Sequence, residues 1–147
     1  MPDNKLKQIS VSIENSHKRL YEVTRALGKA KINLRAMNLV DTGDFGLLRL
    51  LVSDVPAARR IMMTKQIPAR VDEVVAVEIE DKPGSLAKLL KYLLDADVKV
   101  LYMYAVTELS PETAVMIFRF NDNDAAINVL QEKSAKILGA KSFGINK

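Results

Sequence analysis

The fold is decided by residues 75–94, which read VAVEIEDKPGSLAKLLKYLL. In the first part Val75, Val77 and Ile79 alternate with other residues, a spacing typical of a half-buried strand. In the last part apolar residues recur at i, i+3, i+4, i+7 and i+8, which places them on one face of a helix. These residues are Leu86, Leu89, Leu90, Leu93 and Leu94. We therefore predict a strand and an amphipathic helix joined by a short turn.

A weaker copy of this pattern lies 66 residues earlier in the chain. The pairs that match at this offset include Ile13 with Ile79, Leu20 with Leu86, Leu27 with Leu93 and Met37 with Met103. After a hairpin that is two residues longer in the second copy, the offset becomes 68, as between Asp54 and Asp122. A repeat of this kind indicates two copies of one small unit. We expect the units to cover residues 1–72 and 73–147.

Each copy continues with two strands, a second helix and a last strand. The two strands are predicted at residues 33–40 and 46–52, and at residues 98–107 and 113–120 in the second copy. The second helix is predicted to begin near Asp54 or Asp122, and the last strand to cover residues 69–74 or 140–145. The predicted fold class is therefore α+β: two ferredoxin-like βαββαβ units, each an antiparallel sheet with both helices on one face.

The composition excludes several kinds of site. The chain has no cysteine and a single histidine, His17, so disulfides, thiolate nucleophiles and multi-histidine metal sites are excluded. Aromatic residues make up only 5% and the net charge of +4 is spread along the chain, so we expect no nucleic-acid partner. Ser85 and Thr113 have no nearby base, so we expect no catalytic residue, and the sequence indicates no cofactor.

The chain also carries no sign of a membrane segment. The polar N-terminus has no hydrophobic signal core, and the apolar run at residues 114–118 is too short to span a bilayer. We expect a cytoplasmic protein without a membrane partner.

The turn before the second copy's first helix is a candidate binding site. A helix N-terminus offers free N–H groups with positive partial charge, which suits a carboxylate. Gly84 has no Cβ and permits close approach, and Asp81 is placed to accept an ammonium group. The same residues also fit an ordinary helix start, with Asp81 as the N-cap and Pro83 in the first turn. The pattern alone leaves both interpretations open.

The run VEIEDKPGSLAK at residues 77–88, followed by ADVKV at residues 96–100 and by Tyr102, resembles the ACT domain, a small regulatory module that usually binds amino acids. Residues 13–20 and the hairpin DTGDFGLLRL at residues 41–50 are similar to the corresponding parts of tandem ACT proteins. The resemblance covers about residues 7–145, and it repeats at the offset already noted.

What the resemblance implies is a ligand held between two units, with the first turn of one unit facing the second strand of the other. Carried onto this sequence, it implies a ligand-binding set of Asp81, Lys82, Pro83, Gly84, Ser85 and Leu86 with Asn38, and a reciprocal site with Asn15 and Tyr104. The first copy has His17 and Lys18 where the family has Pro-Gly. That site is then either inactive or of a different selectivity.

The strands also predict how the sheet faces are used. Both offsets are even, so matching side chains point to the same side. We assign Met37, Leu39, Met103 and Ala105 to the helix-covered face. The opposite face carries Tyr102, Tyr104, Val115 and Ile117, together with Arg49 and Arg119. It is too apolar to stay bare, so we expect a homodimer through this open face; the alternatives are that the assignment of the two faces is inverted or that the side chains cover each other.

The resemblance implies a regulatory protein that binds a free amino acid and signals to a partner such as a metabolic enzyme. It implies no enzymatic activity. The alternative is a regulatory or structural subunit of an amino-acid biosynthetic enzyme complex that binds no ligand itself.

Overall fold

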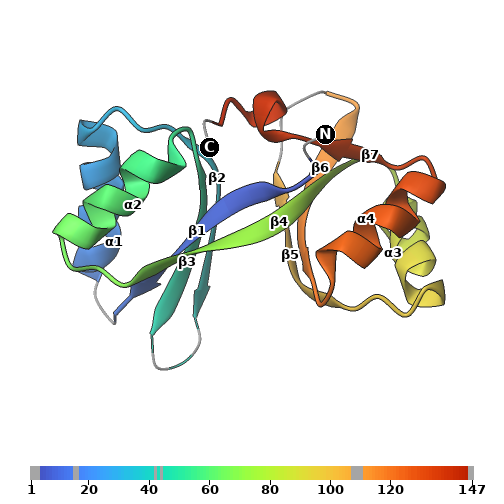
Figure 1. The fold of residues 1–147 in the computed structure, drawn as a ribbon, viewed down its shortest axis with the longest axis horizontal. Coiled ribbons are helices and arrows are strands. Elements are labelled where there is room, and N and C mark those ends of the chain that lie inside the picture. The colour runs from blue at the N-terminus through green and yellow to red at the C-terminus, as the bar shows by residue number, and fades with distance from the viewer. Residues whose placement is uncertain (1–3, 15–16, 42, 44, 107–110, 146–147) are drawn as a thin grey trace. The chain divides into compact units, whose positions relative to one another are not determined.

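The computed structural model describes residues 4–14, 17–41, 43, 45–106 and 111–145 (Figure 1). The described elements are β1 (Leu6–Ile13), α1 (His17–Lys29), β2 (Leu34–Asp41), β3 (Gly46–Val52), α2 (Val55–Thr64), β4 (Ala69–Glu80), α3 (Ser85–Asp95), β5 (Val100–Val106), β6 (Thr113–Phe120), α4 (Asn123–Glu132), β7 (Lys136–Leu138) and a 3₁₀ turn (Ala140–Phe143). The repeated strand and helix order confirms the predicted α+β fold.

The chain forms two compact units. The amino-terminal unit consists of Lys7–Asp72 with Ala140–Lys147, and the carboxy-terminal unit consists of Glu73–Gly139 with Met1–Leu6. The sequence repeat predicts residues 1–6 in the first unit and residues 140–147 in the second, whereas in the structure each of these segments belongs to the other unit. Lys5 forms an ion pair with α4, in which its Nζ lies 2.8 Å from Asp124 Oδ1.

In the amino-terminal unit the strand order is β2-β3-β1-β4, and α1 and α2 cover one face (Figure 1). The buried core residues are Ile9, Val11, Leu48 and Leu50 from the strands and Val23, Leu27, Ala58 and Met62 from the helices. Met37 lies opposite Leu50 and Leu39 opposite Leu48, so their predicted assignment to the helix-covered face is confirmed. Both are nevertheless more than half exposed, because β2 is an edge strand.

In the carboxy-terminal unit the order is β5-β6-β4-β7, with α3 and α4 on one face (Figure 1). The core joins Val75, Val77, Met116, Phe118 and Phe120 of the strands to Leu89, Leu93, Ala126, Ile127 and Leu130 of the helices. The rings of Phe118 and Phe120 stack with centroids 5.1 Å apart. The leucine stripe of residues 86–94 thus supplies this core with Leu89 and Leu93, as its helical spacing predicts.

The predicted last strands differ from the observed ones. The expected strands at residues 69–74 and 75–79 form one continuous strand, β4. The predicted strand at residues 140–145 is wrong: the pairing strand is β7, and Ala140–Phe143 is a 3₁₀ turn. Phe143 and Ile145 are both buried and mimic strand alternation, but Gly144 between them has φ +62° and ends any extended conformation.

The sheet face predicted to mediate a homodimer carries side chains that are buried within the chain. Tyr104, Val115 and Ile117 lie on the predicted face, yet they are only 7%, 1% and 0% exposed within the single chain. The large apolar side chains exposed on the described strands lie on the edge strands instead: Met37 and Leu39 on β2, and Leu101 and Met103 on β5.

Two helices begin with an aspartate cap. The carboxylates of Asp54 and Asp122 accept hydrogen bonds from the N–H groups of Ala57 and Ala125, at 3.1 and 3.0 Å. We expect Asp122→Ala to lower the free energy of unfolding by about 1 kcal/mol, because an N–H of the first turn of α4 loses its acceptor. Urea denaturation measures this loss. The control is Asp122→Asn, which keeps a capping oxygen; an equal loss in both variants would show that the cap is not the cause.

Candidate functional site

The turn between β4 and α3 is held by backbone hydrogen bonds. The N–H of Asp81 donates to the carbonyl of Glu112 at 3.0 Å, and that of Lys82 donates to the carbonyl of Glu80 at 3.1 Å. The turn is therefore anchored to the residue that precedes β6. Asp81, Lys82, Pro83 and Gly84 are all exposed on this turn.

Helix α3 starts without a side-chain cap. Its N-cap is Gly84, in a left-handed conformation with φ +89° and ψ −11°. The prediction that Asp81 is the N-cap is wrong, and Pro83 precedes the cap instead of lying in the first turn. Among the described residues no side chain accepts from the first turn of α3, in contrast to α2 and α4. The N–H of Ser85 donates to the carbonyl of Lys82 at 3.2 Å, and the N–H groups that follow it in the first turn are suited to an anion such as a carboxylate.

The space beside Gly84 is open. A Cβ built on this glycine would meet no atom within 4 Å. The glycine is therefore required by its positive φ and not by crowding, since most residues with a side chain rarely adopt this conformation. A small ligand has room to approach the backbone at this point.

Two charged side chains of the turn pair with each other. Lys82 Nζ lies 2.7 Å from Glu80 Oε2, and both groups are exposed. The hydrogen bond from Lys82 lowers the pKa of the Glu80 carboxyl below its ordinary value. Among the described residues no ion pair involves Asp81, so its carboxylate stays available to a ligand ammonium group.

We expect Lys82→Ala to raise the pKa of Glu80 toward its ordinary value, as measured by an NMR titration. The lowered pKa means that the pair stabilises the fold above the ordinary pKa of glutamate and that this contribution is lost as pH falls through the folded value. Lys88→Ala is the control, because the charge of Lys88 lowers the pKa of Glu80 less than the Lys82 contact does. A Glu80 pKa unchanged by Lys82→Ala would contradict the assigned pair.

Thr113 is a neighbour of the turn that the motif did not single out as a ligand contact. It lies at the start of β6, opposite Glu80 of β4 and directly after Glu112. Its Oγ1 is buried and has no hydrogen-bond partner among the described residues. A buried hydroxyl without a partner is unfavourable, so this atom is a further polar group that a ligand can satisfy. Sequence reasoning considered Thr113 only as a nucleophile.

The remaining predicted residues lie on other elements. Tyr104 is buried on β5 opposite Ile117, which itself lies opposite Ala76, well before the turn along β4. Asn38 lies on β2 of the amino-terminal unit, where its Oδ1 accepts a hydrogen bond from Arg49 Nη1 at 3.1 Å. Asn15 lies outside the described residues. Only residues 81–86 are thus brought together within one unit.

The comparisons with known proteins identify the family. A family model described as an ACT domain pair matches residues 4–144. The chain belongs to the ACT domain pair family. No curated protein matches the chain.

Many solved structures resemble this ACT domain pair, among them the following three. Protein BT0572 from Bacteroides thetaiotaomicron is 34% identical, with a TM-score of 0.91 and 97% of each chain covered. The regulatory subunit of aspartate kinase from Thermus thermophilus is 14% identical, with a TM-score of 0.62, covering 89% of this chain and 93% of that one. A structure of aspartokinase alpha and beta subunits is 16% identical, with a TM-score of 0.59, covering 97% and 94%. The latter two likenesses show the fold alone.

The family places the ACT domain pair among regulatory modules.

Among the described residues no group of three or more His, Cys, Asp or Glu side chains is arranged to hold a metal ion. No helix in the described part of the chain is long and apolar enough to cross a membrane.

Proposed function

We propose that this ACT domain pair binds a free amino acid at the start of α3. The observation that carries the proposal is the uncapped first turn of α3 at left-handed Gly84, beside open space. The ligand carboxylate accepts from the free N–H groups of this turn, and the ligand ammonium contacts the carboxylate of Asp81. Thr113 Oγ1 is an additional partner at the same end of the sheet.

The second half of the proposed site comes from the family resemblance. On that resemblance we propose Asn38 as a further ligand contact, and Asn15 and Tyr104 as the contacts of a reciprocal site. Lys18 takes the place of Gly84 in the first copy, so close approach to the backbone is obstructed there. We therefore propose that the Gly84 site is the one that binds.

The bound amino acid, drawn from the cytoplasmic pool, regulates a partner enzyme through this pair. A ligand shifts an equilibrium only when it binds two states with different affinity. Regulation therefore requires two conformational states of the ACT domain pair that bind the amino acid with different affinity. The fold shared with the regulatory subunit of aspartate kinase is consistent with this role.

A thermal-shift screen of the twenty amino acids tests the proposed function. A ligand at about 100 times its Kd stabilises the folded state by roughly 2.7 kcal/mol, which gives a visible shift in Tm. We expect at least one amino acid to produce such a shift. If none does at millimolar concentration, the ligand-free subunit is the better account.

We further infer self-association through the edge strands. Met37 and Leu39 are exposed on β2, whose outer backbone groups are unpaired in the described sheet. Light scattering is expected to give about twice the 16.4 kDa chain mass, and Met37→Lys with Leu39→Lys is expected to halve it. Tyr21→Lys, an equally exposed apolar position on α1, is the control. A wild-type monomer at high micromolar concentration would contradict this inference.

A further inference from the structure

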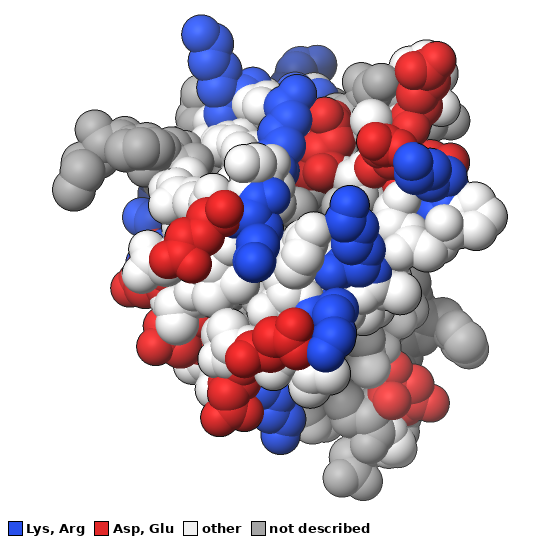
Figure 2. Space-filling view, turned by 90° about the vertical axis from the view of Figure 1, so that its right-hand side faces the viewer, with Lys and Arg blue, Asp and Glu red and all other residues white. Residues whose placement is uncertain are grey.

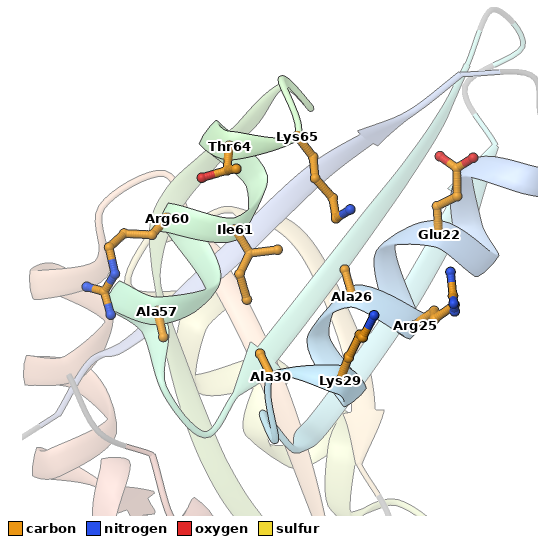
Figure 3. A pocket seen from close by; sticks show the side chains of 10 residues that line it. All are labelled: Glu22, Arg25, Ala26, Lys29, Ala30, Ala57, Arg60, Ile61, Thr64 and Lys65. Atoms are coloured by element: carbon orange, nitrogen blue, oxygen red, sulfur yellow. The ribbon is translucent and has the colours of Figure 1, made fainter.

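A groove of about 640 Å³ lies between α1 and α2 in the amino-terminal unit (Figure 3). Small and apolar side chains form its floor: Ala26 and Ala30 on the α1 side, and Ala57 and Ile61 on α2. In Figure 3 the side chains of Ala26, Ala30 and Ile61 lie between the two helices. The groove is therefore open to another chain and offers it apolar contact along its length.

Cationic side chains border this floor. Arg25 and Lys29 belong to α1, Arg60 belongs to α2, and Lys65 follows α2 directly. All four are exposed, and no ion pair joins any of them to a described residue. The acidic lining residue Glu22 lies 4.0 Å from nitrogens of Lys18 and Arg19, outside the groove floor. The groove thus carries positive charge that the unit itself does not neutralise.

The second copy of the repeat has different side chains at the same position. At the repeat offsets, Ala26 corresponds to Tyr92 and Lys29 to Asp95. Lys133 Nζ lies 5.4 Å from the centre of the Tyr92 ring, and Lys91 Nζ lies 2.6 Å from Asp95 Oδ1. Helices α3 and α4 therefore place an aromatic ring and a paired carboxylate where the amino-terminal unit has Ala26 and Lys29.

The charge patterns of the two units differ accordingly. Figure 2 shows acidic and basic side chains interspersed over the side of the molecule that carries α3 and α4. Helix α2, by contrast, carries Arg59 and Arg60 with no acidic residue. The two units share one fold, so packing alone does not require the small floor residues and the unpaired cations of the groove between α1 and α2.

We propose that the groove between α1 and α2 binds an acidic segment of a partner protein. A small apolar side chain of that segment packs on the alanine floor, and its carboxylates pair with Arg25, Lys29, Arg60 and Lys65. This combination of apolar floor and charged rim is typical of helix-in-groove recognition. The rim charges raise the association rate and select acidic partners, while the floor provides apolar burial.

Other anionic partners fit the groove less well. A small anion needs several donors that converge on one point, whereas the groove floor is made of methyl groups and Ile61. A nucleic acid would find no aromatic side chain among the lining residues for base stacking.

The groove would be the surface through which amino-acid binding is signalled to a partner, so its role in signalling rests on the proposed function. The contact itself requires no amino acid, so it is tested in the absence of amino acids. Failure of that test leaves the α3 site unaffected, and failure of the amino-acid screen leaves the groove unaffected.

The test uses the full chain and a fluorescently labelled helical peptide of about 16 residues, long enough to form four turns. The peptide carries alanine and leucine at i, i+4 and i+7 and glutamate on its flanks, and fluorescence anisotropy measures its Kd. We expect saturable binding that weakens about tenfold or more when glutamines replace the glutamates. We also expect no competition from inorganic phosphate or a double-stranded DNA oligonucleotide.

Two groove variants test the floor and the rim separately. Ala26→Tyr copies the second unit and fills the floor, and Arg25→Glu with Arg60→Glu reverses two rim charges. Each is expected to weaken the peptide at least about tenfold. The control Lys88→Glu with Lys91→Glu makes the same change in net charge on α3 and is expected to leave the Kd within about twofold.

Several results would overturn the proposal. They are an absence of saturable peptide binding to the wild type, equal weakening by the α3 control, and displacement of the peptide by phosphate or DNA. Circular dichroism checks that each variant folds, and the exposed charge variants keep the test valid if Ala26→Tyr does not fold.

Discussion

Truncation of Phe118 to alanine is expected to lower the free energy of unfolding by about 3–5 kcal/mol. The Phe118 side chain is fully buried in the centre of β6 and stacks on Phe120 at 5.1 Å. Its removal takes away apolar burial and an aromatic pair, and it leaves a cavity that the surrounding strands and helices cannot close. Chemical denaturation followed by circular dichroism measures the loss.

The matched control is Leu94→Ala in the same unit. Leu94 belongs to the predicted leucine stripe but is 70% exposed, so its truncation is expected to change the free energy of unfolding by no more than about 0.5 kcal/mol. A loss below about 1 kcal/mol for Phe118→Ala would contradict the described core.

Replacement of Gly84 by valine is expected to abolish the stabilisation by the amino-acid ligand, which is about 2.7 kcal/mol at 100 times Kd. The branched side chain occupies the open space beside the backbone, and it also strains a residue held at φ +89°. In the absence of ligand this strain alone is expected to cost about 1–3 kcal/mol. Thermal melts with and without the amino acid separate the two effects.

Two further variants make this prediction decisive. Gly84→Asn tolerates a left-handed conformation, so it is expected to keep more of the stability and still to weaken the ligand. Lys18→Val changes the matching position of the first copy, and it is expected to leave both stability and binding nearly unchanged. If Lys18→Val removed binding and Gly84→Val did not, the ligand site would belong to the first copy.

The repeated pattern was sufficient to predict the fold. The alternation of Val75, Val77 and Ile79 and the leucine stripe after them gave one strand and one helix, and the repeat extended this result to the rest of the chain. These features are local or periodic, so they are visible in a linear sequence.

Long-range features could not be predicted in the same way. The 3₁₀ turn at Ala140–Phe143 and its grouping with the amino-terminal unit depend on contacts distant in sequence. The burial of Ile117 and Val115 likewise depends on what covers the sheet in the folded chain.

The turn that carries the candidate site was predicted in position but not in detail. The motif located the turn correctly, yet it assigned the N-cap to Asp81, because an aspartate before a helix is the usual cap. The N-cap is instead Gly84 in a left-handed conformation. Its positive φ is a property of the folded backbone that the motif does not encode. The position of the buried Thr113 hydroxyl next to this turn could not be predicted, because Thr113 lies opposite Glu80 only through strand pairing.

We propose above all that the first turn of α3 binds the carboxylate and ammonium groups of an amino acid. Isothermal titration calorimetry of the wild-type chain with the amino acid that gives the largest thermal shift tests it most directly. We predict a saturable heat with one ligand per chain that disappears in Gly84→Val and persists in Lys18→Val. A titration without saturable heat for any of the twenty amino acids, or a heat that Gly84→Val leaves unchanged, would contradict the account.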